Sequence, residues 1–214
     1  WKWTPNSLEA LTALDGNHSI AIGGPTTVIR RATINLVRAT TTVSTTLHGA
    51  PTTHIIESFS EEALVQPNVQ FIRAGAKQIP CALILPRDIQ PGTKLPVLMD
   101  PYGGPHAQRV VDAYTAHCTS QWFADQGFAV LVVDGRGTPG LGTEWERAVY
   151  LDLATTVLED QVDALRAVAA DHPEMDLDRV AIRGWSFGGY LAALAVLRRP
   201  DVFHSAIAGA PVTE

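Results

Sequence analysis

The sequence Gly184-Trp185-Ser186-Phe187-Gly188, of the form G-x-S-x-G, is the most informative part of this 214-residue chain. It follows the apolar run Arg179-Val180-Ala181-Ile182, which is typical of a strand, and it leads into good helix formers at 189–197. A strand, a tight glycine-flanked turn and a helix in this order are the setting of a nucleophile elbow. The flanking glycines provide the room that a serine on a sharp, strained turn requires.

Ser186 is therefore the candidate nucleophile of a serine hydrolase. A serine hydroxyl is a weak nucleophile at neutral pH and needs a neighbouring base. The oxyanion hole of such a site uses the backbone N–H of the residue after the serine, here Phe187, and a donor on the loop after the third strand. That loop is predicted at 100–105, where Tyr102 offers a phenolic donor next to two glycines. From spacing alone, a packing role for Tyr102 at a strand end remains an alternative.

Upstream and downstream of this motif, the part from about Glu61 to Glu214 alternates apolar runs with helical patterns. This alternation predicts an α/β fold with a mostly parallel sheet that is covered on both faces. Strands are expected at 69–73, 79–85, 95–99, 128–133, 179–182 and 203–210, and helices at 116–126, 156–170 and 189–197. The acidic stretch Glu174 to Asp178 is expected to be a loop.

Residues from Trp1 to about Ser58 have a different character. They are rich in Thr and β-branched residues and carry glycine-containing turn signals, which together predict about four short strands. The expected strands lie at 19–22, 26–30, 34–38 and 41–44. This segment has too little core to stand comfortably as a domain, and it has the form of one four-stranded blade of a β-propeller.

Composition excludes several classes of function. The formal net charge of −6 gives no basic surface for nucleic acid. The sequence contains no run of eighteen or more apolar residues, so it predicts no membrane span, and no signal peptide is visible in the chain. Two cysteines, Cys81 and Cys118, are expected to be buried free thiols, which fits a reducing compartment and a cytoplasmic location. No motif predicts a metal site, and no cofactor is expected.

Four motifs in order resemble the prolyl oligopeptidase family of serine peptidases, and more narrowly its dipeptidyl-peptidase IV branch. They are Pro101-Tyr102-Gly103-Gly104-Pro105, Asp134-Gly135-Arg136-Gly137, Leu158-Glu159-Asp160-Gln161-Val162 and Gly184-Trp185-Ser186-Phe187-Gly188-Gly189-Tyr190. The resemblance implies an α/β-hydrolase fold at 61–214, cut short before its last strands. It also implies that 1–58 is the last blade of a preceding β-propeller.

The resemblance also implies roles for single residues. Ser186 matches the nucleophile, and Tyr102 matches the tyrosine whose hydroxyl helps to hold the oxyanion, with the Phe187 amide as the second donor. Val212 matches a valine that lines the small pocket for proline. Asp134 and Arg136 are expected to hold loops together by hydrogen bonds rather than to act in catalysis.

The acid and the base of the triad are the main departure from the family pattern. This fold orders its triad as Ser, then Asp or Glu, then His. After Ser186 the chain contains only the acids Asp201 and Glu214 and the single histidine His204. Asp201 and His204 follow the elbow helix directly and are expected to be structural. The chain is therefore expected to be a piece of a larger enzyme and to be nearly inactive alone.

The expected function of the parent enzyme is to release Xaa-Pro or Xaa-Ala dipeptides from peptide N-termini through an acyl-enzyme on Ser186. The substrate partner is thus a peptide, and a homodimeric parent is left open. Two alternatives remain. A carboxylesterase on the same fold would account for the elbow, and a non-catalytic binding protein would account for the missing triad residues.

Overall fold

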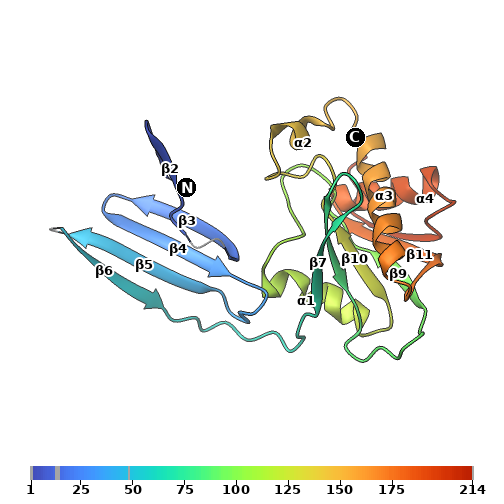
Figure 1. Ribbon diagram of the computed structural model, residues 1–214, viewed down its shortest axis with the longest axis horizontal. Coiled ribbons are helices and arrows are strands. Elements are labelled where there is room, and N and C mark those ends of the chain that lie inside the picture. Colours follow the sequence, from blue (N-terminus) through green and yellow to red (C-terminus); the bar gives the residue numbers. More distant parts are fainter. Residues whose placement is uncertain (1, 13–14, 48, 214) are drawn as a thin grey trace. The chain divides into compact units, whose positions relative to one another are not determined.

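The computed structural model describes residues 2–12, 15–47 and 49–213, and it divides into two compact units. One comprises Trp1–Gln66 with Val111–Cys118, and the other comprises Pro67–Val110 with Thr119–Glu214. Figure 1 labels the helices and strands. The first unit contains a four-stranded sheet and the second a six-stranded sheet, so each is built around its own β-structure.

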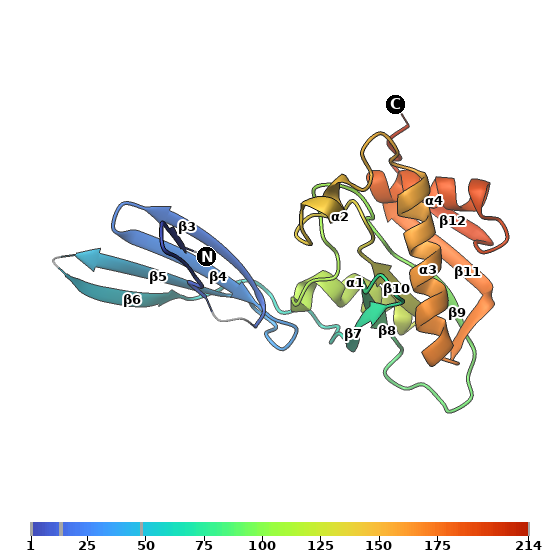
Figure 2. The same cartoon turned by 45° about the horizontal axis from the view of Figure 1, so that its top comes forward.

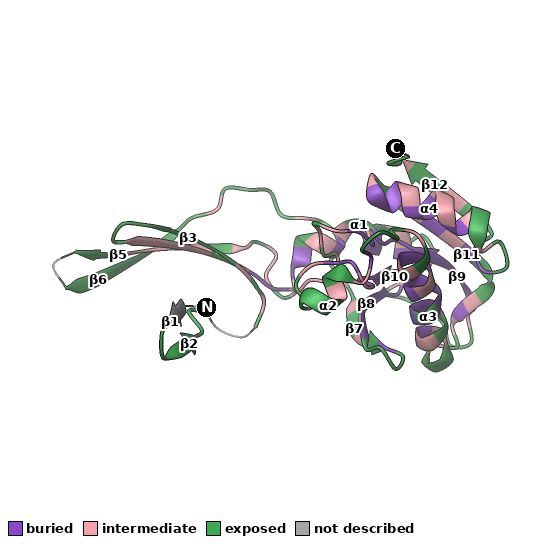
Figure 3. Cartoon of the chain, turned by 90° about the horizontal axis from the view of Figure 1, so that it is seen from above, coloured by how far each residue is buried: buried purple, intermediate pink, exposed green. Residues whose placement is uncertain are grey.

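The first unit is an antiparallel sheet in which neighbours in sequence are neighbours in space, in the order β3-β4-β5-β6. The threonines and β-branched residues of these strands favour extended backbone. The strands are β3 (Asn17–Gly23), β4 (Thr26–Ala32), β5 (Thr40–Leu47) and β6 (Ala50–Ile56), preceded by a pair, β1 (Lys2–Thr4) and β2 (Ser7–Glu9). Figure 3 shows that few residues of this sheet are buried, and β6 is exposed along its whole length.

One expected strand of this unit is a turn. The segment 34–38 does not join the sheet, and the fourth strand is β6 instead. The cause is local hydrogen bonding around Thr33. Its carbonyl accepts from the Leu36 N–H at 3.2 Å and its hydroxyl accepts from the Asn35 N–H at 3.2 Å. Side-chain oxygens that satisfy nearby N–H groups in this way compete with strand pairing.

The second unit has a mixed sheet in the order β12-β11-β9-β10-β8-β7. The first four of these strands run parallel to one another, whereas β8 pairs antiparallel with both β10 and β7. The bounds are β7 (Val69–Ala74), β8 (Ile79–Ile84), β9 (Leu95–Met99), β10 (Ala129–Val133), β11 (Met175–Trp185) and β12 (Ser205–Gly209). The mostly parallel sheet predicted from the alternating pattern is thus present, and β8 is its one strand that runs in the opposite direction.

The start of β11 differs from expectation. The acidic stretch Glu174 to Asp178 was expected as a loop, yet β11 begins within it at Met175, which pairs with Leu95. The Leu95 N–H donates to the Glu174 carbonyl at 2.7 Å, and an irregularity in register separates Asp176 from Val180. The buried side chain of Met175 anchors this first part of the strand.

Helices cover both faces of the second sheet. Alternate residues of β10 belong to different clusters, because side chains along a strand point to opposite faces. Leu131 and Val133 join the larger cluster, whereas Val130 and Val132 join the smaller one with Ala124. The helices are α1 (Tyr114–Ala124), α2 (Thr143–Arg147), α3 (Thr155–Asp171) and α4 (Phe187–Arg198). Figure 2 shows α3 and α4 against the sheet.

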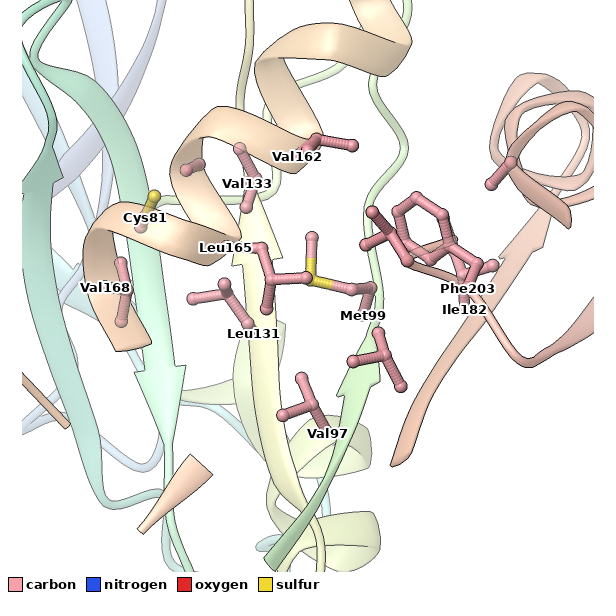
Figure 4. Close-up of a cluster of buried hydrophobic side chains, with 14 of the residues drawn as sticks. Cys81, Val97, Met99, Leu131, Val133, Val162, Leu165, Val168, Ile182 and Phe203 are labelled. Carbon is pink, nitrogen blue, oxygen red and sulfur yellow. The ribbon is translucent and has the colours of Figure 1, made fainter. Parts of the chain in front are cut away.

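The larger cluster is the core of this unit. It joins α3 and α4 to the strands through fully buried aliphatic side chains, and Figure 4 shows Met99, Leu131, Leu165 and Ile182 meeting there. The helix positions that face the sheet recur at three- and four-residue spacing, as the sequence predicts. Each such side chain contributes about 1.5–3 kcal/mol on burial, so this core fixes the strand ends that carry the candidate site.

Candidate active site

Ser186 lies on the single-residue turn between β11 and α4. Its backbone has φ 55° and ψ −118°, in the left-handed region that residues with a side chain seldom adopt. Two backbone hydrogen bonds hold it there. The Ser186 N–H donates to the Gly209 carbonyl at 3.0 Å, and the Ser186 carbonyl accepts from the Tyr190 N–H at 3.0 Å. The half-buried serine is thus held on a strained, fully bonded turn, the geometry expected of a nucleophile elbow.

The glycines around Ser186 permit this turn. A Cβ on Gly184 would collide with the Gly188 carbonyl, and a Cβ on Gly188 would lie 2.7 Å from the Pro101 carbonyl oxygen. The crowding that the G-x-S-x-G motif implies is therefore present. Gly189, which the sequence analysis named only as part of the family motif, is crowded in the same way. A Cβ there would collide with the carbonyl oxygen of Gly209.

Tyr102 lies in the loop after β9, and this loop packs against the elbow. A Cβ on Gly188 would lie 3.4 Å from the Tyr102 Cα, and the rings of Tyr102 and Phe187 have centroids 6.0 Å apart. The Phe187 ring also meets Tyr190 edge-on at 5.4 Å. Because Phe187 is the first residue of α4, its N–H has no acceptor within the helix. The structure thus brings Tyr102, Phe187 and Ser186 into one small region.

Buried aspartates anchor the rest of this loop. Both carboxylate oxygens of Asp134 accept the Arg109 N–H at 3.0 Å, and one of them accepts the Val110 N–H at 2.8 Å. Asp100 accepts from the Arg109 guanidinium at 2.9 Å and from the Ser120 hydroxyl at 3.0 Å. Burial raises the pKa of Asp134, and the backbone donors offset this only in part. Sequence reasoning assigned Asp134 to this kind of role but missed Asp100 and Arg109.

Arg136 and Asp160 form a second anchor. The Arg136 side chain donates two hydrogen bonds to the Asp160 carboxylate, at 2.8 and 2.9 Å, and its backbone N–H donates a third at 2.8 Å. Lys77 adds a fourth at 3.1 Å. Burial alone would raise the pKa of Asp160, but the donors from Arg136 and Lys77 outweigh it and hold the pKa below its usual range. This carboxylate holds the segment after β10 in place, and its charge is neutralised locally.

Asp201 and His204 are occupied elsewhere, as expected of structural residues. The Asp201 carboxylate is paired with the Arg199 guanidinium at 2.9 Å. The ring Nδ1 of His204 accepts a hydrogen bond from the backbone N–H of Val180 at 3.0 Å. The backbone N–H of His204 donates to the Val180 carbonyl at 2.8 Å. Val180 lies six residues before Ser186, about 20 Å along an extended strand. The structure does not bring this acid and this histidine together with Ser186.

Val212 lies three residues beyond Gly209 and is 49% exposed. Gly209 is the residue that bonds to the Ser186 N–H, so Val212 follows the strand adjoining the elbow. Its assignment to a proline pocket stays a prediction. Among residues 2–12, 15–47 and 49–213, no group of three or more His, Cys, Asp or Glu side chains could hold a metal ion. Within the part of the chain that the structure describes, no helix combines the length and the apolar character of a transmembrane span.

Comparison with known proteins identifies the family. Residues 114–214 match the model of the prolyl oligopeptidase family. This segment belongs to the prolyl oligopeptidase family. The family is one of serine peptidases, so the resemblance carried by the four sequence motifs is confirmed.

Individual relatives agree with this assignment. Mouse dipeptidyl peptidase 8 is 41% identical over 133 residues, which are 61% of this chain and 15% of that protein. Mouse prolyl endopeptidase FAP is 36% identical over 131 residues, again 61% of this chain and 17% of that protein. The chain therefore spans less than a fifth of the length of these two prolyl oligopeptidase relatives.

The crystal structure of Porphyromonas gingivalis dipeptidyl peptidase 4 superposes with a TM-score of 0.76 at 26% sequence identity. The match covers 94% of this chain and 29% of that chain. The predicted fold class is confirmed, namely an α/β-hydrolase fold preceded by strands of the β-propeller type. The assignment of 1–58 and 61–214 to these two domains stays a prediction.

Proposed function

We propose that the protein containing this chain is a serine peptidase that releases Xaa-Pro or Xaa-Ala dipeptides from peptide N-termini, with Ser186 as the nucleophile. The observation that carries this proposal is the placement of Ser186 at φ 55° between β11 and α4, directly before the N–H of Phe187. Membership of residues 114–214 in a serine peptidase family supports an amide substrate.

The proposed reaction uses two groups around the serine. The Ser186 Oγ attacks the carbonyl carbon of the scissile amide, and its proton passes to a base. The oxygen of the tetrahedral intermediate then accepts hydrogen bonds from the Phe187 N–H and the Tyr102 hydroxyl. The leaving amine takes the proton from the base, and water hydrolyses the resulting ester on Ser186.

The packing described above supports a role for Tyr102. Its loop touches Gly188 and its ring faces Phe187, so the phenol is carried next to the first turn of α4. The hydrogen bonds from Arg109 to Asp134 and Asp100 hold this loop as well. A preorganised donor of this kind contributes about 100- to 1,000-fold to kcat in serine hydrolases.

The base is proposed to come from the remainder of a polypeptide of the relatives' length. His204 does not fit the role, because its Nδ1 accepts a backbone hydrogen bond from Val180 in β11. The assignment of Val212 to a proline pocket is likewise a proposal about the full-length protein. Both proposals predict that peptidase activity belongs to the full-length protein rather than to these 214 residues alone.

The test is hydrolysis of Gly-Pro-p-nitroanilide by the full-length protein. Ser186→Ala is expected to lower kcat/KM by about 10⁴-fold or more, because the nucleophile is lost. Ser205→Ala, at an exposed serine of the adjoining strand, is the matched control and should stay within about twofold of the parent. Full activity of the Ser186→Ala protein would overturn the proposal.

Short-chain esters separate this function from an esterase on the same fold. A peptidase should show a higher kcat/KM for the dipeptidyl amide once the two substrates are corrected for their uncatalysed rates. Hydrolysis of esters alone would instead favour the carboxylesterase. No reaction with either substrate would favour the non-catalytic binding protein.

A further inference from the structure

An apolar cavity of about 520 Å³ lies beside the segment that follows β10. Its lining includes large apolar side chains that are exposed to solvent. Tyr150 is 79% exposed, Leu151 is 89% exposed and Leu153 is 46% exposed. Pro105 and the buried Val149 complete the apolar wall. A cluster of exposed large apolar side chains around a cavity is typical of a binding surface, whereas apolar side chains that are exposed singly are common on any protein surface.

The backbone holds these side chains in place at a strained position. Leu151 has φ 63°, in the left-handed region that a leucine rarely adopts. Hydrogen bonds fix the residues on either side of it. The Tyr150 N–H donates to the Arg147 carbonyl at 2.9 Å, and the Asp152 N–H donates to the Val149 carbonyl at 3.1 Å. A strained residue that is held by its surroundings and points apolar atoms outward is a candidate functional feature.

The cavity lies within reach of Ser186. Pro105 is bonded to Gly104, and Gly104 is so close to the Phe187 ring that a Cβ on it would collide with the ring. Phe187 in turn is bonded to Ser186. Summing these steps from standard bond geometry places the Pro105 and Ser186 Cα atoms no more than about 15 Å apart. An extended peptide covers that distance in about four to five residues.

Strand order sets the side of the serine on which the cavity lies. The carboxyl ends of the parallel strands occur in the order β12, β11, β9, β10. Ser186 follows β11, and Val212 follows β12 on one flank. Pro105 follows β9, and the remaining lining follows β10, on the other flank. If the residue bearing the scissile carbonyl lies toward Val212, as the proposed function has it, the leaving-group residues extend toward the cavity.

We infer that this cavity binds an apolar side chain of the peptide substrate on the leaving-group side of the scissile bond, three to five residues beyond it. The inference rests on the proposed function, because it takes the polarity of the bound peptide from Ser186 and Val212. Glu146 and Arg147, which also line the cavity, carry opposite charges, so the lining gives no net attraction for a charged side chain.

Two seven-residue peptides test the inference on the full-length protein. Both begin Gly-Pro, and one carries Leu and the other Ser at each of positions five to seven, which are the third to fifth residues beyond the scissile bond. The parent protein is expected to cleave the Leu peptide with a kcat/KM at least about tenfold higher, since filling an apolar pocket discriminates by that order. The ratio of the two values is independent of how much of each preparation is active.

Leu153→Ser is the variant that tests the cavity itself. It should lower the Leu-to-Ser preference at least about fivefold, whereas Leu197→Ser, an exposed leucine of α4 outside the cavity, should keep the preference within about twofold. Absence of a Leu preference in the parent, or a preference that survives Leu153→Ser, would overturn the inference alone. Failure to cleave either peptide or Gly-Pro-p-nitroanilide would overturn it together with the proposed function.

Discussion

The backbone N–H of Ser186 donates a hydrogen bond to the carbonyl oxygen of Gly209 at 3.0 Å. The same carbonyl oxygen lies so close to Gly189 that a Cβ on that residue would collide with it. The turn that presents the serine is thus tied to β12 as well as to its own strand and helix. The position of the hydroxyl depends on contacts between segments that lie more than twenty residues apart in the sequence.

The crowding at the elbow predicts that a Gly→Ala substitution there lowers stability, whereas the same substitution at an uncrowded glycine does not. Gly189→Ala should destabilise the protein by about 1–3 kcal/mol or more, because the new Cβ meets the Gly209 carbonyl and the backbone must move. Gly23→Ala, at a glycine with no neighbour within 4 Å and no left-handed backbone, should change stability by no more than about 0.5 kcal/mol. Urea unfolding of both variants checks this, and equal stability of the two would contradict the described packing.

Removal of the Tyr102 hydroxyl should affect the chemical step rather than binding. Tyr102→Phe keeps the ring that faces Phe187, so the loop should stay in place. In the full-length protein, kcat for Gly-Pro-p-nitroanilide is expected to fall about 100- to 1,000-fold with little change in KM. An unchanged kcat would show that Tyr102 only packs, which is the alternative that sequence spacing left open.

The Cys81 thiol should resist alkylation in the native protein. Burial, together with the nearby charge of Asp134, raises the pKa of Cys81 to about 12, so the reactive thiolate is scarce at neutral pH. Cys118 is partly exposed and should react first, although burial raises its pKa as well. Iodoacetamide labelling at pH 8, read by peptide mass spectrometry, should modify Cys81 only after unfolding. Rapid native labelling of Cys81 would contradict this burial.

Asp160 should make stability fall in acid. Its pKa is lowered in the folded state, so its contribution is present above the unfolded-state pKa and is lost as the pH falls through the folded-state pKa. Asp160→Asn should cost about 1–3 kcal/mol at pH 7, because charged hydrogen bonds from Arg136 and Lys77 are weakened. The difference between parent and variant should shrink below pH 4.

Asp163 is the matched control for that experiment. It lies on the same helix and pairs with Lys77 at 2.6 Å, but its side chain is half exposed. Asp163→Asn should therefore cost no more than about 1 kcal/mol at pH 7. A cost for Asp160→Asn that is no larger than this, or that does not depend on pH, would argue against the buried network.

Local patterns predicted much of the fold. The apolar run Phe128 to Val133 became the buried strand β10, and the three- and four-residue spacing from Val157 to Val168 became the inner face of α3. The elbow was predictable because strand, glycine-flanked serine and helix are adjacent in sequence. In each case the sequence pattern and the element that it predicts involve the same few neighbouring residues.

Contacts between distant segments were not predictable in the same way. The segment 34–38 has strand composition, but Thr33 accepts the N–H groups of Asn35 and Leu36 locally. The acidic residues after Pro173 suggest a loop, but Met175 enters the sheet because Leu95 lies opposite. The anchor between Asp100 and Arg109 depends on a loop conformation that spacing does not encode. Single-residue patterns carry no information on such partners.

Covalent labelling of the full-length protein with a fluorophosphonate tests most directly that Ser186 is an activated nucleophile. Peptide mass spectrometry is expected to find one adduct, on the Ser186 oxygen, and Ser186→Ala should abolish it while Ser205→Ala leaves it intact. An adduct on another residue, or an unlabelled Ser186 in a preparation that hydrolyses Gly-Pro-p-nitroanilide, would contradict the assignment.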